Sequence, residues 1–187
     1  KKEHADAAQK RFAFQEIFLI HVQKAFERKQ YQQLFSFKLN VPKKDVQDFI
    51  DTFPFEPTTG QMDALGHIFR DIQSDEPMSR LIEGDVGSGK TFLAAVASYA
   101  TIMNRPAGQE FGNLQVAYMA PTEVLAVQLF ENFIEYFKNT GISIGLVTGS
   151  GCRKFPTKVA SSQKPWTEIS KTQLVKWIKS GEIAITV

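Results

Sequence analysis

The 187-residue sequence lacks several features that would place it in a specialised class of proteins. It has a single cysteine, Cys152, so no internal disulfide can form, which fits a reducing, cytoplasmic setting. No apolar run approaches the ~20 residues that span a bilayer, so we expect no transmembrane helix and no membrane partner. The charged residues 1–6 do not resemble a signal peptide.

Histidine and net charge are also scarce. The three histidines, at positions 4, 21 and 67, lack the spacing of a metal site. The formal net charge is only +2, but residues 1–55 carry 10 basic and 7 acidic side chains, residues 56–137 carry 4 and 11, and residues 138–187 carry 8 and 2. The two ends are therefore basic and the middle is acidic, which permits a polyanionic partner at either end.

The sequence does contain enough apolar residues, 43%, for an ordinary globular core. Its length corresponds to one domain and a little more, at ~150 residues per domain. Apolar spacing predicts an amphipathic helix over residues 12–30, which needs another element to lie against, and a short helix from Pro42 to about residue 52.

From residue 55 onward, short apolar runs alternate with helical patterns. We expect strands over residues 80–83, 114–120, 143–148 and 183–187, and helices over residues 58–73, 89–103, 123–139 and from Ser170, where Gln173 completes a capping box. Residues 149–165 are rich in Gly, Ser, Lys and Pro and are expected to form an exposed insertion. The alternation predicts an α/β fold with a parallel sheet flanked by helices, preceded by a helical region. We expect the chain to stop in mid-fold, because its last parallel strand has no following loop.

One motif carries a definite chemistry. It runs Gly84-Asp85-Val86-Gly87-Ser88-Gly89-Lys90-Thr91 and satisfies G-x-x-x-x-G-K-[ST] between an expected strand and an expected helix. Such glycines let successive backbone N–H groups face one anion, and the following helix adds its dipole. Lys90 supplies positive charge for the β- and γ-phosphates, and Thr91 offers a hydroxyl to Mg²⁺. The motif predicts nucleotide binding, with ATP and Mg²⁺ as cofactors.

Phosphate binding does not define what is done with the nucleotide. Transfer or hydrolysis needs a further Mg²⁺-holding carboxylate, a group that orients the nucleophile and often an arginine finger, and none is identifiable from the sequence. Asp85 lies inside the loop, where it serves either as part of the nucleotide site or simply as an exposed acid.

Further stretches around this loop carry a resemblance. They are Phe53-Pro54-Phe55 with Thr59-Gly60-Gln61, residues 77–91, residues 119–128 with Pro121-Thr122-Glu123, and Thr148-Gly149-Ser150. In this order they resemble the first motor domain of the RecG family, the ATP-dependent branched-DNA helicases of bacteria. The resemblance runs from about residue 53 to residue 150, and the helix before it resembles the RecG segment that joins the wedge to the motor.

The resemblance implies roles for individual residues. It implies that Gln61 reads adenine with Phe55 near the base, that residues 84–91 hold ATP, and that Lys90 and Thr91 are catalytic, with Thr91 on Mg²⁺. It implies DNA contacts at Pro121, Thr122, Glu123, Gln128, Thr148, Gly149 and Ser150. Local alternatives remain open: Gln61 caps its helix, Thr122 is an N-cap, and residues 148–150 form a turn.

The resemblance also implies an organisation. Residues 1–54 correspond to the end of the wedge region, and residues 55–187 to a RecA-like motor domain that stops before the family's Asp-Glu box. The whole protein is expected to be a monomer that remodels stalled forks and Holliday junctions in recombination and repair, while this chain alone would bind Mg-ATP weakly and hydrolyse almost none.

Two alternatives stay open. A transcription-repair coupling translocase shares the loop, but that family usually has Tyr at the position of Ser88 and Pro-Thr-Thr at residues 121–123. A P-loop module without a DNA role is the other; residues 121–128 and the basic end of the chain argue against it.

Overall fold

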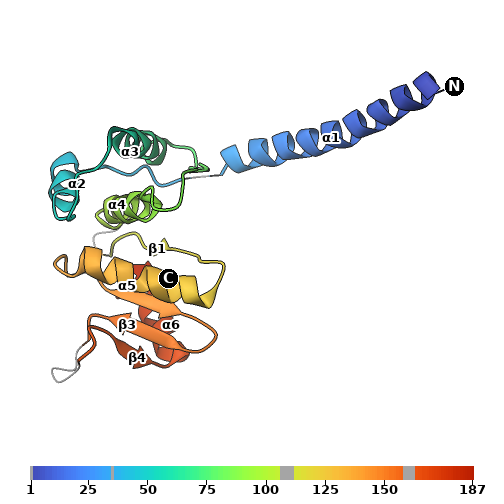
Figure 1. Cartoon of the computed structure of the whole chain (residues 1–187). Coiled ribbons are helices and arrows are strands. Elements are labelled where there is room, and N and C mark those ends of the chain that lie inside the picture. Colours follow the sequence, from blue (N-terminus) through green and yellow to red (C-terminus); the bar gives the residue numbers. More distant parts are fainter. Residues whose placement is uncertain (1, 35, 106–111, 158–162) are drawn as a thin grey trace.

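The computed structural model describes residues 2–34, 36–105, 112–157 and 163–187. A long N-terminal helix projects away from a body in which helices surround a five-stranded sheet (Figure 1). The helices are α1 Lys2–Gln32, α2 Lys43–Ile50, α3 Thr59–Ile72, α4 Lys90–Ile102, α5 Glu123–Phe137 and α6 Lys171–Lys179. The strands are β1 Val116–Ala117, β2 Ile144–Val147, β3 Cys152–Phe155, β4 Thr167–Ile169 and β5 Ile185–Thr186. The expected α/β class is confirmed.

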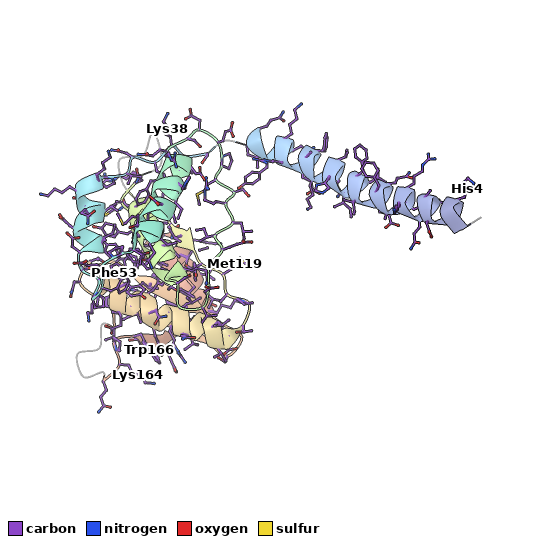
Figure 2. All side chains as sticks on the ribbon, turned by 45° about the horizontal axis from the view of Figure 1, so that its top comes forward. His4, Lys38, Phe53, Met119, Lys164 and Trp166 are labelled. Atoms are coloured by element: carbon purple, nitrogen blue, oxygen red, sulfur yellow. The ribbon has the colours of Figure 1, made fainter. Side chains whose placement is uncertain are left out.

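The projecting helix α1 forms as predicted, although it begins at Lys2 rather than at residue 12. Its side chains are exposed wherever they are described, including Phe12 at 65% and Phe14 at 68%. The sequence predicted that this helix lies against another element, but no element in the described part of the chain covers its apolar side chains (Figures 1 and 2). None of the described helices is long and apolar enough to cross a membrane.

The short helix α2 packs on α4 through aromatic rings. Phe49 stacks on Tyr99 with ring centroids 4.2 Å apart, and Phe53 meets Phe92 edge-on at 4.9 Å. Pro42 is the N-cap of α2 rather than its first helical residue. Aromatic pairs in this geometry contribute about 0.5–1.5 kcal/mol beyond their burial. Residues on both sides of the expected boundary at residues 54–55 therefore share one core; the boundary itself stays a prediction.

The sheet has the order β1-β5-β2-β3-β4. Strands β1, β5 and β2 are parallel, with Ile185 opposite both Val116 and Ile144, which matches the predicted alternation of strands and helices. Strand β3 then turns back antiparallel to β2, and β4 pairs antiparallel with β3. The expectation that residues 149–165 form an exposed insertion is wrong over residues 152–155, because β3 extends the sheet and Cys152, Lys154 and Phe155 are buried. Residues 158–162 of that insertion lie outside the described residues.

The strand expected over residues 80–83 is absent from the described chain. These residues belong to none of the five paired strands, and Leu81 is 80% exposed. A strand is stable only where a neighbour accepts and donates its ladder hydrogen bonds. None of the five described strands pairs with residues 80–83, although Ile82 packs against the main core.

Helices cover both faces of the sheet. Ile144 and Leu146 of β2 pack into the main core with α5, while Leu174 of α6 packs with Cys152 and Ile183 on the other face. Gly145 permits the close approach of α6, since a Cβ there would come within 2.8 Å of the Leu174 side chain. Alternating side chains of one strand thus serve two helix layers, as the period of a strand requires.

Candidate functional site

The predicted phosphate-binding loop, residues 84–91, leads directly into α4. Gly87 and Gly89 have φ values of +83° and +87°, in the left-handed region that only glycine adopts without strain. A Cβ on Gly84 would lie 2.6 Å from the Ser88 hydroxyl oxygen. At each of the three glycines of the motif, a larger side chain would therefore cause backbone strain or a close contact within this loop. Val86 at the tip is fully exposed, and Asp85 is exposed as well.

The ammonium group of Lys90 lies at the centre of the loop. It donates hydrogen bonds to the carbonyl oxygens of Gly84 and Asp85, both at 2.7 Å. A flexible ammonium with three donors can exchange these carbonyls for phosphate oxygens when a nucleotide binds. The position of Lys90 is compatible with its predicted phosphate contact, which stays a prediction.

Thr91 follows in the first turn of α4. Its hydroxyl is a hard oxygen ligand of the type that Mg²⁺ prefers, and Mg²⁺ is usually held by one or two protein oxygens together with substrate phosphates. No group of three or more His, Cys, Asp or Glu side chains with metal-site geometry occurs among the described residues. Mg²⁺ binding by Thr91 stays a prediction.

Gln61 bridges α3 and the phosphate-binding loop. Its side-chain oxygen accepts from the Thr58 N–H at 2.9 Å, and its own N–H donates to the Thr58 hydroxyl at 3.3 Å, which completes a capping box. Its side-chain amide nitrogen donates to the Ser88 carbonyl at 2.9 Å. The capping interpretation is confirmed, while adenine reading by Gln61 stays a prediction. The amide still has a second N–H and a second oxygen lone pair that could face a base, because each atom uses only one in these bonds.

Phe55 lies beside a cavity near the start of α3. Its ring is 42% exposed and meets Phe53 and Phe92 edge-on at 5.6 and 5.5 Å. A cavity of about 460 Å³, lined by residues 50, 51 and 53–57, opens at this position. A larger cavity of about 1050 Å³ lies between α2 and the C-terminal ends of α4 and α5, and none of residues 84–91 lines it. Phe55 lines the smaller cavity and not the larger one, and residues 84–91 line neither.

The residues predicted to contact a DNA strand form two segments, residues 121–123 and 148–150, that touch each other. Thr122 is the N-cap of α5 and accepts from the Leu125 N–H at 3.4 Å, so its capping role is confirmed. In the 148–150 turn, the N–H and hydroxyl of Thr148 both donate to the Gly151 carbonyl, at 3.0 and 2.9 Å. Ser150 donates a hydrogen bond to the Glu123 carboxylate, which joins the turn to α5. Gln128 is exposed further along α5, and Pro121 is exposed just before it.

Residues 121–123 and 148–150 come together because each segment follows the carboxyl end of a parallel strand. Residues 121–123 follow β1 and residues 148–150 follow β2, and both strands run parallel to β5 between them. Parallel strands place their carboxyl ends at one edge of a sheet, where α/β proteins bind their ligands. The link between Glu123 and Ser150 was not predicted, because a spacing of 27 residues carries no local signal.

A second contact that sequence reasoning missed anchors the approach to the phosphate-binding loop. The Arg80 guanidinium donates to both Asp71 carboxylate oxygens, at 2.6 and 2.9 Å. This hydrogen bonding holds the pKa of the Asp71 carboxyl below its ordinary value and raises the pKa of Arg80. Such a bidentate pair fixes direction as well as distance, so it ties residues 77–84 to α3.

The basic end of the chain divides into a buried part and a surface part. Lys154 is buried, pairs with Glu182 at 2.9 Å and lies 4.6 Å from the Trp177 ring centroid. Arg153 and Lys164 lie 4.3 and 4.5 Å from the ring centroid of Trp166. Figure 2 shows Lys164 and Trp166 together beside the β3–β4 ribbon. Part of the positive charge is therefore structural, while Arg153 and Lys164 gather at one indole.

The phosphate-binding loop, its Lys90 and Thr91, and the mainly parallel sheet define a P-loop nucleotide-binding domain of the RecA-like kind. The sequence profile described as "DEAD/DEAH box helicase" matches residues 58–176, and the chain belongs to this family.

The relatives at hand are RecG proteins, which confirms the resemblance seen in the sequence. The chain is 32% identical over 182 residues to the ATP-dependent DNA helicase RecG of Aquifex aeolicus, covering 97% of this chain and 20% of that protein. It is 39% identical over 142 residues to RecG of Haemophilus influenzae, covering 76% and 19%. A structure of RecG bound to a three-way DNA junction superimposes with a TM-score of 0.73 at 28% identity, covering 100% of this chain and 22% of that one. The chain thus spans about a fifth of the length of these RecG proteins.

Proposed function

We propose that this chain forms the ATP-binding and strand-contacting part of a RecG-type helicase that remodels branched DNA. The observation that carries the proposal is that the two predicted strand-contacting segments, residues 121–123 and 148–150, touch each other at the carboxyl edge of the sheet in a chain with a complete phosphate-binding loop. The substrates are stalled forks and four-way junctions, and the setting is recombination and repair in the cytoplasm.

In the nucleotide half of the site, Lys90 binds the β- and γ-phosphates and Thr91 holds the accompanying Mg²⁺. Gln61 and Phe55 contact the base. Mg²⁺ supplies charge neutralisation of the transferred phosphoryl group when it is bound. Gln61 already touches the phosphate-binding loop through Ser88, so occupation of the base site is coupled to the loop through one side chain.

In the DNA half, hydroxyls and backbone N–H groups of residues 121–123 and 148–150 bind phosphates of one strand. Such contacts set the position of a strand and carry no base information, which suits an enzyme that selects branch shape rather than sequence. The N-terminal turn of α5 adds the positive end of its dipole to these contacts. The whole protein acts as a monomer, with residues 1–54 as the helical connection from the wedge region.

Two alternatives give different results with DNA. A transcription-repair coupling motor would bind duplex DNA without preferring a branch. A P-loop module without a DNA role would not bind DNA at all. Substitution of Lys90 weakens nucleotide binding under each of them and so does not separate them.

The test is an electrophoretic mobility shift with a fork, a four-way junction and a linear duplex of equal length, at several salt concentrations. The proposal expects tighter binding to the branched molecules and an affinity that falls steeply with salt, since each phosphate contact adds about −0.9 to the slope of log affinity against log salt. Equal affinity for fork and linear duplex, or no binding, would contradict it.

A further inference from the structure

Glu123 and Ser150 belong to different elements and meet at the surface. Glu123 is the first residue of α5, and Ser150 lies in the turn between β2 and β3. The Ser150 hydroxyl donates to Oε1 of Glu123, and a Cβ on Gly149 would lie 3.7 Å from Oε2. Both oxygens of the carboxylate therefore face the 148–150 turn.

A serine hydroxyl has one proton, and this one is used on Glu123. The Ser150 and Thr148 hydroxyl oxygens lie 3.2 Å apart. The Thr148 hydroxyl also reaches the Gly151 carbonyl at 2.9 Å. Because the single proton of the Thr148 hydroxyl goes to the Gly151 carbonyl, the turn is held by two separate hydrogen bonds, one from Ser150 to the Glu123 carboxylate and one from Thr148 to the backbone that leads into β3.

A carboxylate is an unfavourable group to place against DNA phosphates, because like charges repel and no counterion is released. The first turn of α5 does favour an acid, through the helix dipole, by about 0.3–1 kcal/mol at an exposed position. The dipole accounts for an acid in this turn, but it does not account for the direction of both carboxylate oxygens towards the 148–150 turn.

We propose that Glu123 is a positioning residue for DNA rather than a DNA contact. It fixes the 148–150 turn against the first turn of α5, so that the two segments bind one strand as a unit. This inference rests on the proposed function. It replaces the direct contact that the resemblance implied for Glu123, and it leaves that role to Thr122 and the 148–150 turn.

The two roles predict opposite changes in the DNA affinity of a Glu123→Ala variant. If the Glu123 carboxylate acts only by its charge, Glu123→Ala removes repulsion and tightens DNA binding. If it positions the turn, Glu123→Ala frees the turn and weakens binding by about tenfold, the loss of one hydrogen bond to a charged group. Glu123→Gln keeps an acceptor oxygen for the Ser150 hydroxyl while it removes the charge, so affinity is retained or rises.

The experiment measures fork-DNA affinity of the full-length protein and its Glu123→Ala, Glu123→Gln, Ser150→Ala and Glu123→Ala/Ser150→Ala variants. Glu131→Ala is the matched control, because Glu131 is an exposed acid of the same helix. We expect weak binding by Glu123→Ala, rescue by Glu123→Gln, and no further loss in the double variant beyond that of Ser150→Ala. Hydrogen exchange of the DNA-free proteins should be faster at residues 149–151 in Glu123→Ala, while thermal unfolding confirms that each variant is folded.

The outcomes separate the two proposals. If the unchanged protein binds forks but Glu123→Ala binds equally well or better, or if the effects of the two single substitutions add, the positioning role is wrong and the proposed function stands. A Glu123→Gln variant as weak as Glu123→Ala also overturns the positioning role, because it shows that the charge itself is needed. Absence of fork binding by the unchanged protein overturns both.

Discussion

The side-chain amide nitrogen of Gln61 donates a hydrogen bond to the Ser88 carbonyl oxygen over 2.9 Å, across 27 residues of sequence. The same side chain completes the capping box of α3 with Thr58. One residue therefore connects the start of α3 with the phosphate-binding loop.

Substitution of Gln61 should affect both partners. Gln61→Ala removes the capping contact, at a cost of about 1 kcal/mol, and releases the loop. Gln61→Glu keeps the acceptor for Thr58 but loses the donor to Ser88, so we expect near-normal stability with weaker ATP binding and less discrimination of ATP from GTP. Thermal unfolding and titration with both nucleotides check this, with Asp63→Ala on the same helix as the control. Unchanged discrimination in both Gln61 variants would show that the base is read elsewhere.

Gly89 should tolerate no side chain. Its φ is +87°, and a Cβ would lie 2.3 Å from the Gln61 amide nitrogen. Gly89→Ala therefore combines backbone strain of about 1–2 kcal/mol with displacement of Gln61, and ATP binding should fall. Gly66→Ala in α3 is the control, because a Cβ there meets open space, and this change should be neutral or stabilise the helix by up to about 1 kcal/mol. Equal unfolding temperatures for the two variants would contradict this account.

Lys90→Ala should weaken nucleotide binding by about 10- to 100-fold, the equivalent of the ~1.5–3 kcal/mol of a hydrogen bond to a charged group. Fork-DNA affinity without nucleotide should stay unchanged, because the ammonium lies inside the loop on the Gly84 and Asp85 carbonyls. Isothermal titration with Mg-ATP and a mobility shift give the two affinities. Lys43→Ala, an exposed change on α2, should alter neither. A parallel loss of DNA binding would place Lys90 at both sites.

The Asp71–Arg80 pair should make a pH-dependent contribution to stability. The folded-state pKa of Asp71 lies below its unfolded value, so the contribution is present above the unfolded pKa of about 3.9 and is lost as pH falls through the lower folded pKa. Arg80→Ala should therefore lower the unfolding temperature near neutral pH, and the difference from the unchanged protein should shrink in acid. Asp71→Ala/Arg80→Ala completes the cycle. A difference that grows with acidity would have the wrong sign for this pair.

Two adjacent basic residues should behave differently. Lys154→Ala should reduce stability by about 1–3 kcal/mol, because it removes a buried side chain that packs on Trp177 and pairs with Glu182, while the DNA affinity of the folded protein should hold. Arg153→Ala should leave stability nearly unchanged and weaken salt-dependent DNA binding, since its guanidinium lies at the surface beside Trp166 and Lys164. Chemical denaturation and mobility shifts distinguish the two; a shared stability defect would make both residues structural.

Features that depend on a few neighbouring residues were predicted well. The helix from Lys90 to Ile102, the capping box between Thr58 and Gln61, and the glycines of the phosphate-binding loop all formed as expected. Helix capping, helical periodicity and left-handed backbone conformations depend on residues within about one helical turn of each other, so they can be predicted from a short stretch of sequence.

Features that depend on partners distant in the sequence were not predicted from it. Residues 80–83 read as a strand but pair with none of the described strands, while residues 152–155 read as an exposed insertion but form β3 between β2 and β4. Polarity gave no indication that Lys154 is buried, because its partners Glu182 and Trp177 arrive from another part of the chain.

By itself, then, the sequence determined the chemistry: a loop that binds phosphate, helices that begin and end at defined residues, and motifs shared with RecG helicases. Only the tertiary structure decided which of these residues act together. The meeting of Gln61 with Ser88, and of Glu123 with Ser150, comes from parallel strands and packed helices that bring distant segments to one edge of the sheet. Local conformation is a property of a few residues, whereas contact across the fold depends on burial and strand pairing of the whole domain.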